Sequence, residues 1–140
     1  MIFSLPCEKL KNNGVKKEKI RIEYPLDRVS KSSLWTCLST PGGLAEWFAD
    51  EVTDEGKVFT FTWGKHKTVA ELVGVNPLIY IRFHWVDDEE DTYFEFRLHR
   101  IELTGEWMLE ITDFAEEDEK EHAVTLWNTQ IKTLKRRLGL

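Results

Sequence analysis

The sequence predicts an α+β fold: a curved antiparallel sheet of about six to seven strands wrapped around one long C-terminal helix, with two short helices after the first strand. Three observations predict it. Apolar and polar residues alternate in successive segments between residues 57 and 114, turn signals separate these segments, and residues 116–138 carry an apolar stripe at helical spacing. A sheet of this size with one apolar face must be covered, and only the C-terminal helix is long enough to cover it.

The N-terminal part of this arrangement is a strand followed by a helix. Residues 19–26, KIRIEYPL, alternate apolar and charged side chains, which is typical of a half-buried strand. Pro25 ends the strand because proline has no N–H to donate to a neighbouring strand. Ser30 suits the N-cap of a helix over residues 30–39.

A second short helix is predicted over residues 41–49, PGGLAEWFA. Pro41 fits its first turn, where a missing N–H costs nothing. Its apolar face carries Leu44, Trp47 and Phe48 at i, i+3 and i+4. Such a face either packs the end of the core or forms the rim of a cavity, and apolar helix faces are more often core.

The strands that follow are bounded by turn signals such as Asn76-Pro77 and Thr104-Gly105. The acidic run DDEED, residues 87–91, reads as a solvated hairpin tip. The predicted strands cover residues 57–64, 67–75, 78–86, 92–103 and 106–114.

The C-terminal helix, residues 116–138, is the clearest element. It begins with acidic residues and ends with basic ones, as the helix macrodipole favours, and Gly139 is well placed to end it. Its apolar stripe consists of Ala123, Trp127, Ile131, Leu134 and Leu138.

The length of 140 residues predicts one domain, over residues 17–140, preceded by a flexible tail over residues 1–16. Val15 followed by two lysines suggests an alternative translation start, in which case residues 1–14 do not belong to the native protein. Two cysteines, Cys7 and Cys37, are too few for a disulfide framework or a metal site, so we expect a reducing, cytoplasmic location.

The net charge of −6 and the pI near 5.3 argue against a nucleic-acid partner or a general anionic-membrane surface. No apolar run approaches the ~20 residues that span a bilayer, so no stable membrane insertion is expected.

Several motifs in this order resemble the START-like (SRPBCC) helix-grip superfamily: IEYPL, LSTPGGLAEWFADEV, FTFTWG, YIRFHWVDDEEDTYFEFRL, ITDFAEEDE and the terminal helix. More narrowly, the chain resembles small single-domain bacterial START-like proteins close to the activator of heat-shock-ATPase group. The resemblance covers roughly residues 18–139. It implies a helix-grip fold with a cavity between sheet and long helix, which relatives use for apolar ligands, and it transfers no catalytic motif.

The candidate ligand site is the set of large side chains on the predicted inner faces. The functional interpretation is an aromatic-lined pocket for an apolar or flat ligand; the alternative is that these rings fill the space themselves. The candidate ligand-binding residues are Trp47, Phe48, Phe61, Trp63, Phe83, Trp85, Phe94, Phe96, Trp107, Trp127 and Ile131.

Other chemistry has weaker support. His66, His84, His99 and His122 lie on four predicted elements without a metal-ligand spacing, and the acidic runs at 87–91 and 116–121 lack the pattern of a calcium loop. Cys37 reads as a buried, inert thiol.

Two further groups have structural interpretations. Asp113 is expected to cap the terminal helix or to orient Arg97, with capping preferred. Arg82 and Arg97 either bind an anionic ligand head or pair with Glu95 on the sheet surface.

The function predicted is therefore binding of an apolar or amphipathic small molecule, such as a lipid, in a cavity between sheet and C-terminal helix. No catalysis, metal or cofactor is assigned. The alternative is a protein-interaction or co-chaperone-like module without a bound small molecule. An enzyme ranks last, because the predicted inner faces carry almost no polar groups.

Overall fold

The computed structural model describes residues 16–140, so the predicted tail over residues 1–16, with the suggested start at Val15, lies outside the described residues except for Lys16. The elements are β1 (Glu18–Leu26), α2 (Lys31–Ser39), α3 (Pro41–Leu44), β2 (Glu51–Glu55), β3 (Val58–Trp63), β4 (His66–Asn76), β5 (Tyr80–Trp85), β6 (Phe94–Ile101), β7 (Glu106–Ala115), the 3-10 turn η1 (Glu117–Glu119) and α4 (Lys120–Leu138).

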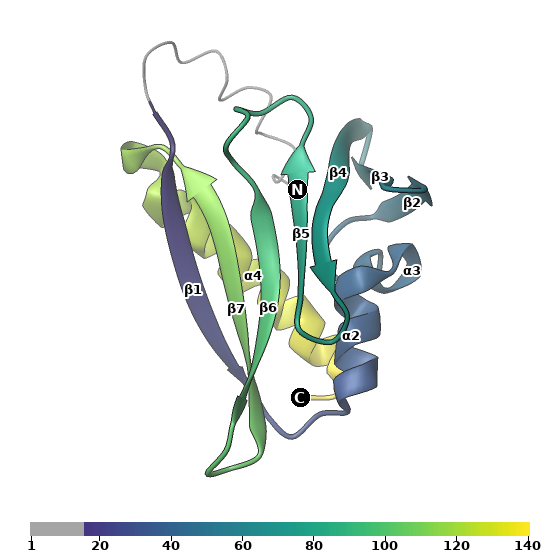
Figure 1. Cartoon of the computed structure of the whole chain (residues 1–140), viewed down its shortest axis with the longest axis vertical. Helices are drawn as coiled ribbons and strands as arrows, with labels where there is room; N and C mark the ends of the chain where they lie inside the picture. Colours follow the sequence, from purple (N-terminus) through teal and green to yellow (C-terminus); the bar gives the residue numbers. More distant parts are fainter. Residues whose placement is uncertain (1–15) are drawn as a thin grey trace.

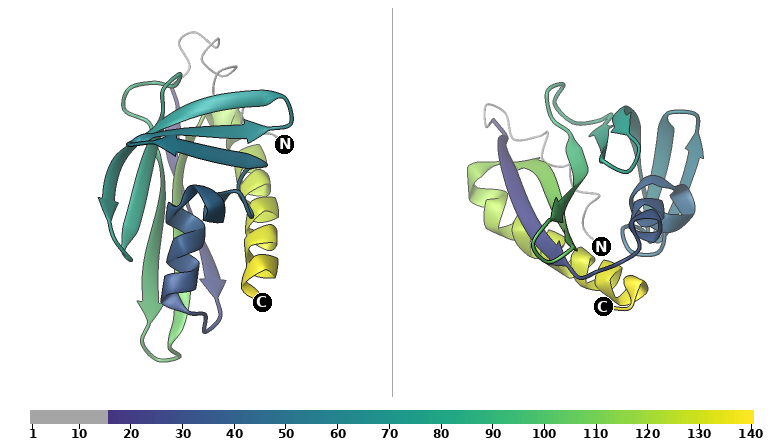
Figure 2. Two further views of the ribbon diagram at one scale, coloured as in Figure 1. Left: turned by 90° about the vertical axis from the view of Figure 1, so that its right-hand side faces the viewer. Right: turned by 60° about the horizontal axis from the view of Figure 1, so that its bottom comes forward.

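The seven strands form one antiparallel sheet in the order β1-β7-β6-β5-β4-β3-β2. The sheet is open and curved, and α4 crosses its concave side diagonally (Figure 1). The short helices α2 and α3 lie beside α4, beneath β2, β3 and β4 (Figure 2). The predicted fold class is confirmed.

Three element boundaries differ from the prediction. β2 was not predicted, because Glu51–Glu55 contains a single apolar residue, Val52, and shows no alternation. The second helix ends at Leu44 instead of residue 49, since the amides of Phe48 and Ala49 both bond to the carbonyl of Leu44 and the chain leaves the helical path. The terminal helix begins at Lys120, after the turn η1.

The core lies between the concave face of the sheet and α4. Alternate residues of β3 and β5 point inward, as the pattern predicts, and on α4 the buried side chains include Trp127, Ile131 and Leu134. A bulge between Leu72 and Gly74 shifts the register of β4 against β5 and leaves Val73 53% exposed.

The corner between α2 and α3 is held by Thr40. Its hydroxyl donates to the carbonyl of Thr36 at 2.8 Å and accepts the amide of Gly43 at 2.9 Å, so one side chain closes α2 and caps α3. Ser30 caps α2 as predicted, accepting the amide of Ser33. The tight corner brings Gly43 onto the backbone of α2.

This close approach predicts opposite effects for two neighbouring glycines. A Cβ at Gly43 would clash with the carbonyl of Thr36 and lie 2.7 Å from the Cα of Cys37, whereas a Cβ at Gly42 meets nothing within 4 Å. We expect Gly43→Ala to lower the free energy of unfolding by about 2–3 kcal/mol. The matched control Gly42→Ala should leave it unchanged or raise it by up to about 1 kcal/mol. Urea denaturation of both variants checks this, and equal stabilities would contradict it.

Candidate functional site

The structure brings together ten of the eleven predicted ligand-binding side chains in one buried cluster. Trp107 is the exception: it packs half-buried against the lower edge of this cluster. The buried ten are Trp47, Phe48, Phe61, Trp63, Phe83, Trp85, Phe94, Phe96, Trp127 and Ile131.

The rings of this cluster pack against one another. Phe48 lies at its centre, with its ring centroid 5.3–6.0 Å from those of Phe61, Phe96 and Trp127, among others. Toward β5 the tightest pair is Trp85 and Phe94, with centroids 4.8 Å apart. These separations are those of stacked and edge-to-face aromatic pairs, so the rings themselves occupy the space between sheet and α4. Trp47 and Phe48 thus belong to the core, as the preferred interpretation expected.

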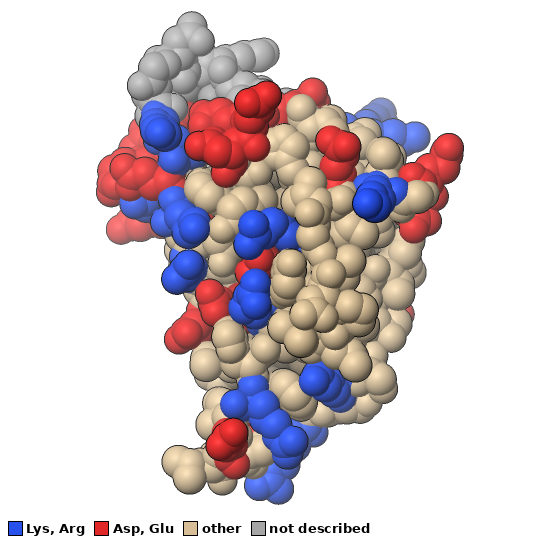
Figure 3. Space-filling model, viewed as in Figure 1, with Lys and Arg blue, Asp and Glu red and all other residues tan. Residues whose placement is uncertain are grey.

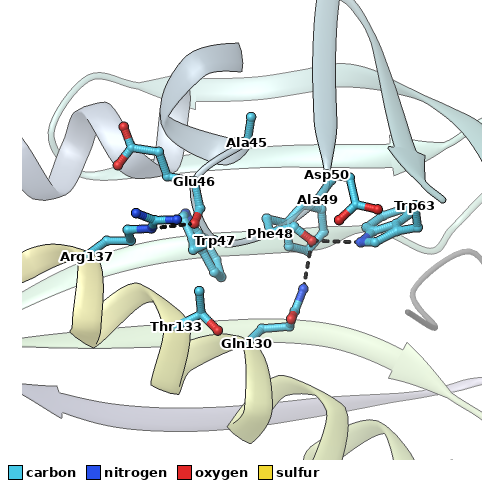
Figure 4. Close-up of a pocket in the computed structure, with 10 residues that line it drawn as sticks. All are labelled: Ala45, Glu46, Trp47, Phe48, Ala49, Asp50, Trp63, Gln130, Thr133 and Arg137. Carbon is cyan, nitrogen blue, oxygen red and sulfur yellow. Dashed lines mark hydrogen bonds between the residues drawn. The ribbon is translucent and has the colours of Figure 1, made fainter.

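The carbonyl of Phe48 ties three parts of the fold together. It accepts a hydrogen bond from Trp63 Nε1 on β3 at 2.9 Å and another from Gln130 Nε2 on α4 at 2.7 Å (Figure 4). Two helical turns further on, Arg137 Nε donates to the carbonyl of Glu46 at 3.1 Å. Residues 45–50 are therefore attached to α4 by two side chains. We call this segment the clasp segment.

A pocket of about 350 Å³ lies between the clasp segment and the C-terminal half of α4. In Figure 4 Gln130 and Thr133 rise from α4 toward the clasp segment, while the carboxylate of Glu46 points away from them. The lining residues are Ala45, Glu46, Trp47, Phe48, Ala49, Asp50, Trp63, Gln130, Thr133 and Arg137.

Sequence reasoning found three of these residues, Trp47, Phe48 and Trp63, and missed the polar ones on α4. Gln130 is 5% exposed, and its sequence signal is weak: it stands next to Ile131 and three residues after Trp127, on the apolar side of the helix. Its side chain donates to the backbone carbonyl of Phe48, 82 residues earlier in the sequence. No sequence pattern predicts a hydrogen bond of this kind.

Asp113 attaches the middle of α4 to the sheet. Its carboxylate accepts Trp127 Nε1 at 2.8 Å and the amide of Phe114 at 2.8 Å. The prediction that it caps the terminal helix is wrong, because neither η1 nor α4 has a side-chain cap. Burial raises the pKa of Asp113 to about 6, although the two hydrogen bonds and the charge of Lys17 act in the opposite direction.

On the outer face of the sheet Arg82 and Arg97 pair with one carboxylate. Arg82 lies 2.8 Å and Arg97 3.0 Å from oxygens of Glu95, which is buried between them. Burial by itself would raise the pKa of Glu95, but the hydrogen bonds from Arg97 and Arg82 outweigh it and hold the pKa below its usual value. The pairing interpretation of these arginines is the one that this geometry fits.

The remaining candidates are structural. His99 is exposed and bonds to Glu110 at 2.7 Å, and His84 Nδ1 lies 2.8 Å from the carbonyl of Thr92. Cys37 is buried, and burial, followed by the charge of Glu46, raises the pKa of its thiol. Within residues 16–140, His, Cys, Asp and Glu form no group of three that could hold a metal ion.

One buried polar atom in the interior has no partner. The hydroxyl of Thr68, on β4 opposite Phe61, makes no hydrogen bond to any described residue, although Thr68 is only 4% exposed. A buried unpaired hydroxyl costs roughly 1–3 kcal/mol, so such groups call for an explanation.

This arrangement, a curved antiparallel sheet closed by a long C-terminal helix over an aromatic core, defines a helix-grip fold. A family model described as the START-like superfamily domain matches residues 14–140, and the chain belongs to that superfamily. No curated protein matches the sequence.

Solved structures agree with this assignment. The solution NMR structure of BfR322 from Bacteroides fragilis is 47% identical over 87% of this chain and 91% of that one, with a TM-score of 0.64. The solution structure of the Aha1 dimer from Colwellia psychrerythraea shares 18% identity over 86% and 96% of the two chains, with a TM-score of 0.72. DynU16, from the dynemicin biosynthetic locus, shares 16% identity over 89% of this chain and 48% of that one, with a TM-score of 0.73. At these identities the last two show the fold alone.

The environment of Asp113 predicts a pH effect on stability. Its pKa is about 6 in the folded protein, against 3.8 for an ordinary aspartate side chain. Because the folded value is raised, this carboxyl favours folding most at pH values below about 4, and that contribution is lost as the pH rises through about 6. Asp113→Asn has no titrating group here, so its stability relative to the parent protein should rise by up to about 3 kcal/mol across this window.

Urea denaturation of both proteins between pH 4 and pH 8 measures this difference. All other carboxyls titrate alike in the two proteins, so their contributions cancel. Asp91→Asn, on the exposed β5–β6 loop, is the matched control and should run parallel to the parent. A parallel curve for Asp113→Asn as well would contradict the prediction.

Proposed function

We propose that the chain is a binding module for a small apolar or amphipathic molecule, which it takes up between the clasp segment and α4. The observation that carries this proposal is the pocket of about 350 Å³, bordered by three of the predicted ligand-binding side chains. Membership of the START-like superfamily supports a binding or interaction role in general. The cytoplasmic location predicted from the cysteines belongs to the same proposal.

The chemistry of the pocket suits a ligand with one polar and one apolar part. The polar part meets Gln130, Thr133 and Arg137 on α4, while Trp47 and Ala49 offer apolar contacts on the clasp segment. The lining is more polar than apolar and the pocket is open to solvent, so the polar groups on α4 supply most of the contact and orient the ligand, while the apolar part makes the smaller contact. We assign no catalytic step to these residues.

The unpaired hydroxyl of Thr68 supports a deeper route into the core. Trp63 both borders the pocket and stacks on Phe61, at 6.1 Å between centroids, and Phe61 pairs with Thr68. A ligand that displaces the clasp segment reaches the aromatic cluster, where its polar group would satisfy this hydroxyl. The predicted side chains of the buried cluster, without Trp107, are then the second part of the same site.

The first test is native mass spectrometry of protein purified gently from cell lysate. We expect a non-covalent adduct of small-molecule mass that is lost on denaturation. Thr133→Trp should remove it, because the indole fills the pocket, while the control Thr129→Trp, on the exposed face of the same helix, should retain it. Thr68→Val distinguishes binding in the pocket from binding in the aromatic cluster. It removes the Thr68 hydroxyl, so it lowers adduct retention only if the ligand reaches the interior.

A clean apo mass in every preparation, or an adduct that survives both Thr133→Trp and Thr68→Val, would contradict the proposal. If Thr129→Trp retains the adduct, its loss in Thr133→Trp is not a general effect of introducing an indole on α4. Circular dichroism of each variant checks that the fold is intact.

The second candidate function is protein interaction, and an exposed apolar patch at the β4–β5 hairpin favours it. Val73, Val75, Leu78 and Ile79 are 38–53% exposed. Leu78 has φ of +68°, the only non-glycine with positive φ among the described residues, in a turn closed by a bond from the amide of Ile79 to the carbonyl of Asn76. The positive φ of Leu78 costs conformational energy. Because the side chain is partly exposed, burial within the monomer offsets little of that energy.

The distant structural relative from Colwellia psychrerythraea is a dimer, which makes a second copy the first partner to test. Leu78→Asn removes the apolar side chain and suits the left-handed backbone, so it should raise the stability of the monomer by up to about 1 kcal/mol. If the patch is an interface, the parent protein sediments as a dimer at micromolar concentration and Leu78→Asn sediments as a monomer. A monomeric parent protein would remove self-association as the role of the patch.

A further inference from the structure

The hairpin between β6 and β7 projects from the lower end of the molecule, beyond α4 and α2, in two views (Figures 1 and 2). At its tip Leu103 is 99% exposed, the most exposed of the large apolar side chains described. The tip is held in place: Gly105, at φ +75°, bonds back to the carbonyl of Ile101 at 2.8 Å, and Arg28 Nε donates to the carbonyl of Thr104 at 2.8 Å. An apolar side chain is thus presented to solvent on a fixed support.

Two cations lie against an aromatic ring behind this tip, and a third, Arg28, lies beside the turn itself. The ammonium of Lys31 lies 4.9 Å and the guanidinium carbon of Arg100 lies 5.9 Å from the centroid of Trp107. Arg28 and Arg100 both approach Gly105, since a Cβ there would lie 3.8 Å and 3.7 Å from their nitrogens. The half-buried Trp107, the predicted site residue that the core left aside, is the centre of this group.

These cations lack acidic partners. In the part of the chain that the structure describes, Arg28, Lys31 and Arg100 form no ion pair with a carboxylate. Glu102 and Glu106 belong to the same hairpin but lie beyond ion-pair distance. Lys31 is moreover the first residue of α2, where the helix macrodipole disfavours a positive charge. Its contact with the ring of Trp107 supplies no counter-charge, so the charge of Lys31 is available to an anionic surface.

The net charge of −6 conceals a segregated distribution. Acidic residues gather at the opposite end, on the β5–β6 loop and at the start of α4, whereas the lower end carries basic residues with an acidic patch among them, beside an uncharged tip (Figure 3). The last turn of α4, with Lys135, Arg136 and Arg137, adds further positive charge at this end. An anionic surface would therefore be repelled by the upper end, and at the lower end it could meet the basic residues around the tip.

We propose that the lower end, formed by Leu103, Trp107, Arg28, Lys31 and Arg100, docks on the surface of an anionic lipid membrane. Leucine at the tip, tryptophan behind it and cations alongside match the order of layers at a bilayer surface, from acyl chains through the interface to the phosphates. A projecting tip also fits a deformable lipid surface, whereas a protein partner would need a matching cavity. In the described residues no helix is long and apolar enough to cross a bilayer, and docking needs none.

The contact is weak and reversible. A cation near an anionic surface strengthens partitioning by about fivefold, and burial of a leucine side chain by roughly tenfold. The contribution of the cations is lost at high salt, because the electrostatic attraction decays within a Debye length of about 10 Å at 0.1 M, whereas the contribution of the leucine is not screened. The proposal does not depend on the pocket between the clasp segment and α4.

Vesicle flotation tests it, with phosphatidylcholine vesicles and with vesicles containing 30% phosphatidylserine (roughly one lipid in three, in the range where surface potential is substantial). We expect binding to the anionic vesicles only, and less of it as salt is raised. Leu103→Asn should weaken it roughly tenfold, and Lys31→Gln with Arg100→Gln about 25-fold.

Matched controls isolate the site. Val73→Asn changes an exposed apolar side chain elsewhere, and Lys57→Gln with Lys65→Gln removes two charges from the turns that flank β3; both should bind like the parent protein. Thermal unfolding confirms that each variant is folded.

Absence of binding to the anionic vesicles, or equal losses in the site variants and their controls, would overturn the proposal. Binding to soluble polyglutamate without binding to vesicles would also overturn it, in favour of an acidic protein surface.

Discussion

The backbone carbonyl of Phe48 is the point on which the arrangement of helices, clasp segment and sheet depends. It receives one hydrogen bond from β3 and one from α4, while the ring of the same residue contacts aromatic side chains from both. A carbonyl can accept two bonds only if its residue is not using it inside a helix or a ladder. The early end of α3 at Leu44 meets this condition, because it releases the carbonyls that follow.

Two neighbouring attachments of α4 depend on different chemistry. Near its middle Trp127 donates to Asp113 in a buried site where ionisation is costly, and further along Gln130 donates to a neutral carbonyl. The first attachment depends on pH and the second does not. The side of α4 that faces the pocket is thus held by neutral hydrogen bonds and by Arg137, which keeps its charge throughout the physiological range. Changes in pH act on the sheet side of the helix.

The sequence predicted those features that periodicity encodes. Alternation identified β3, β5, β6 and β7, and the stripe on residues 116–138 identified the helix that covers them, so the fold and most of the aromatic cluster followed. β2 carries no such pattern and forms because its neighbour β3 supplies the ladder. Asp113 and Gln130 were misread or missed because their partners, Trp127 and the Phe48 carbonyl, are chosen by three-dimensional proximity. The lower end escaped notice because net charge averages over both ends of the molecule.

The position of β2 at the margin of the sheet has a consequence for behaviour in a crowded solution. An open sheet leaves a row of unpaired backbone groups on each outer strand, which another chain can extend into an aggregate. β2 has only five residues, and Glu51, Asp54 and Glu55 are three of them. A strand from a second molecule could form only a few backbone hydrogen bonds with so short a strand. If the added strand were a second β2, its carboxylates would also repel those of the first. The segment with the least apolar content in the sheet therefore protects the β2 edge against pairing with another molecule.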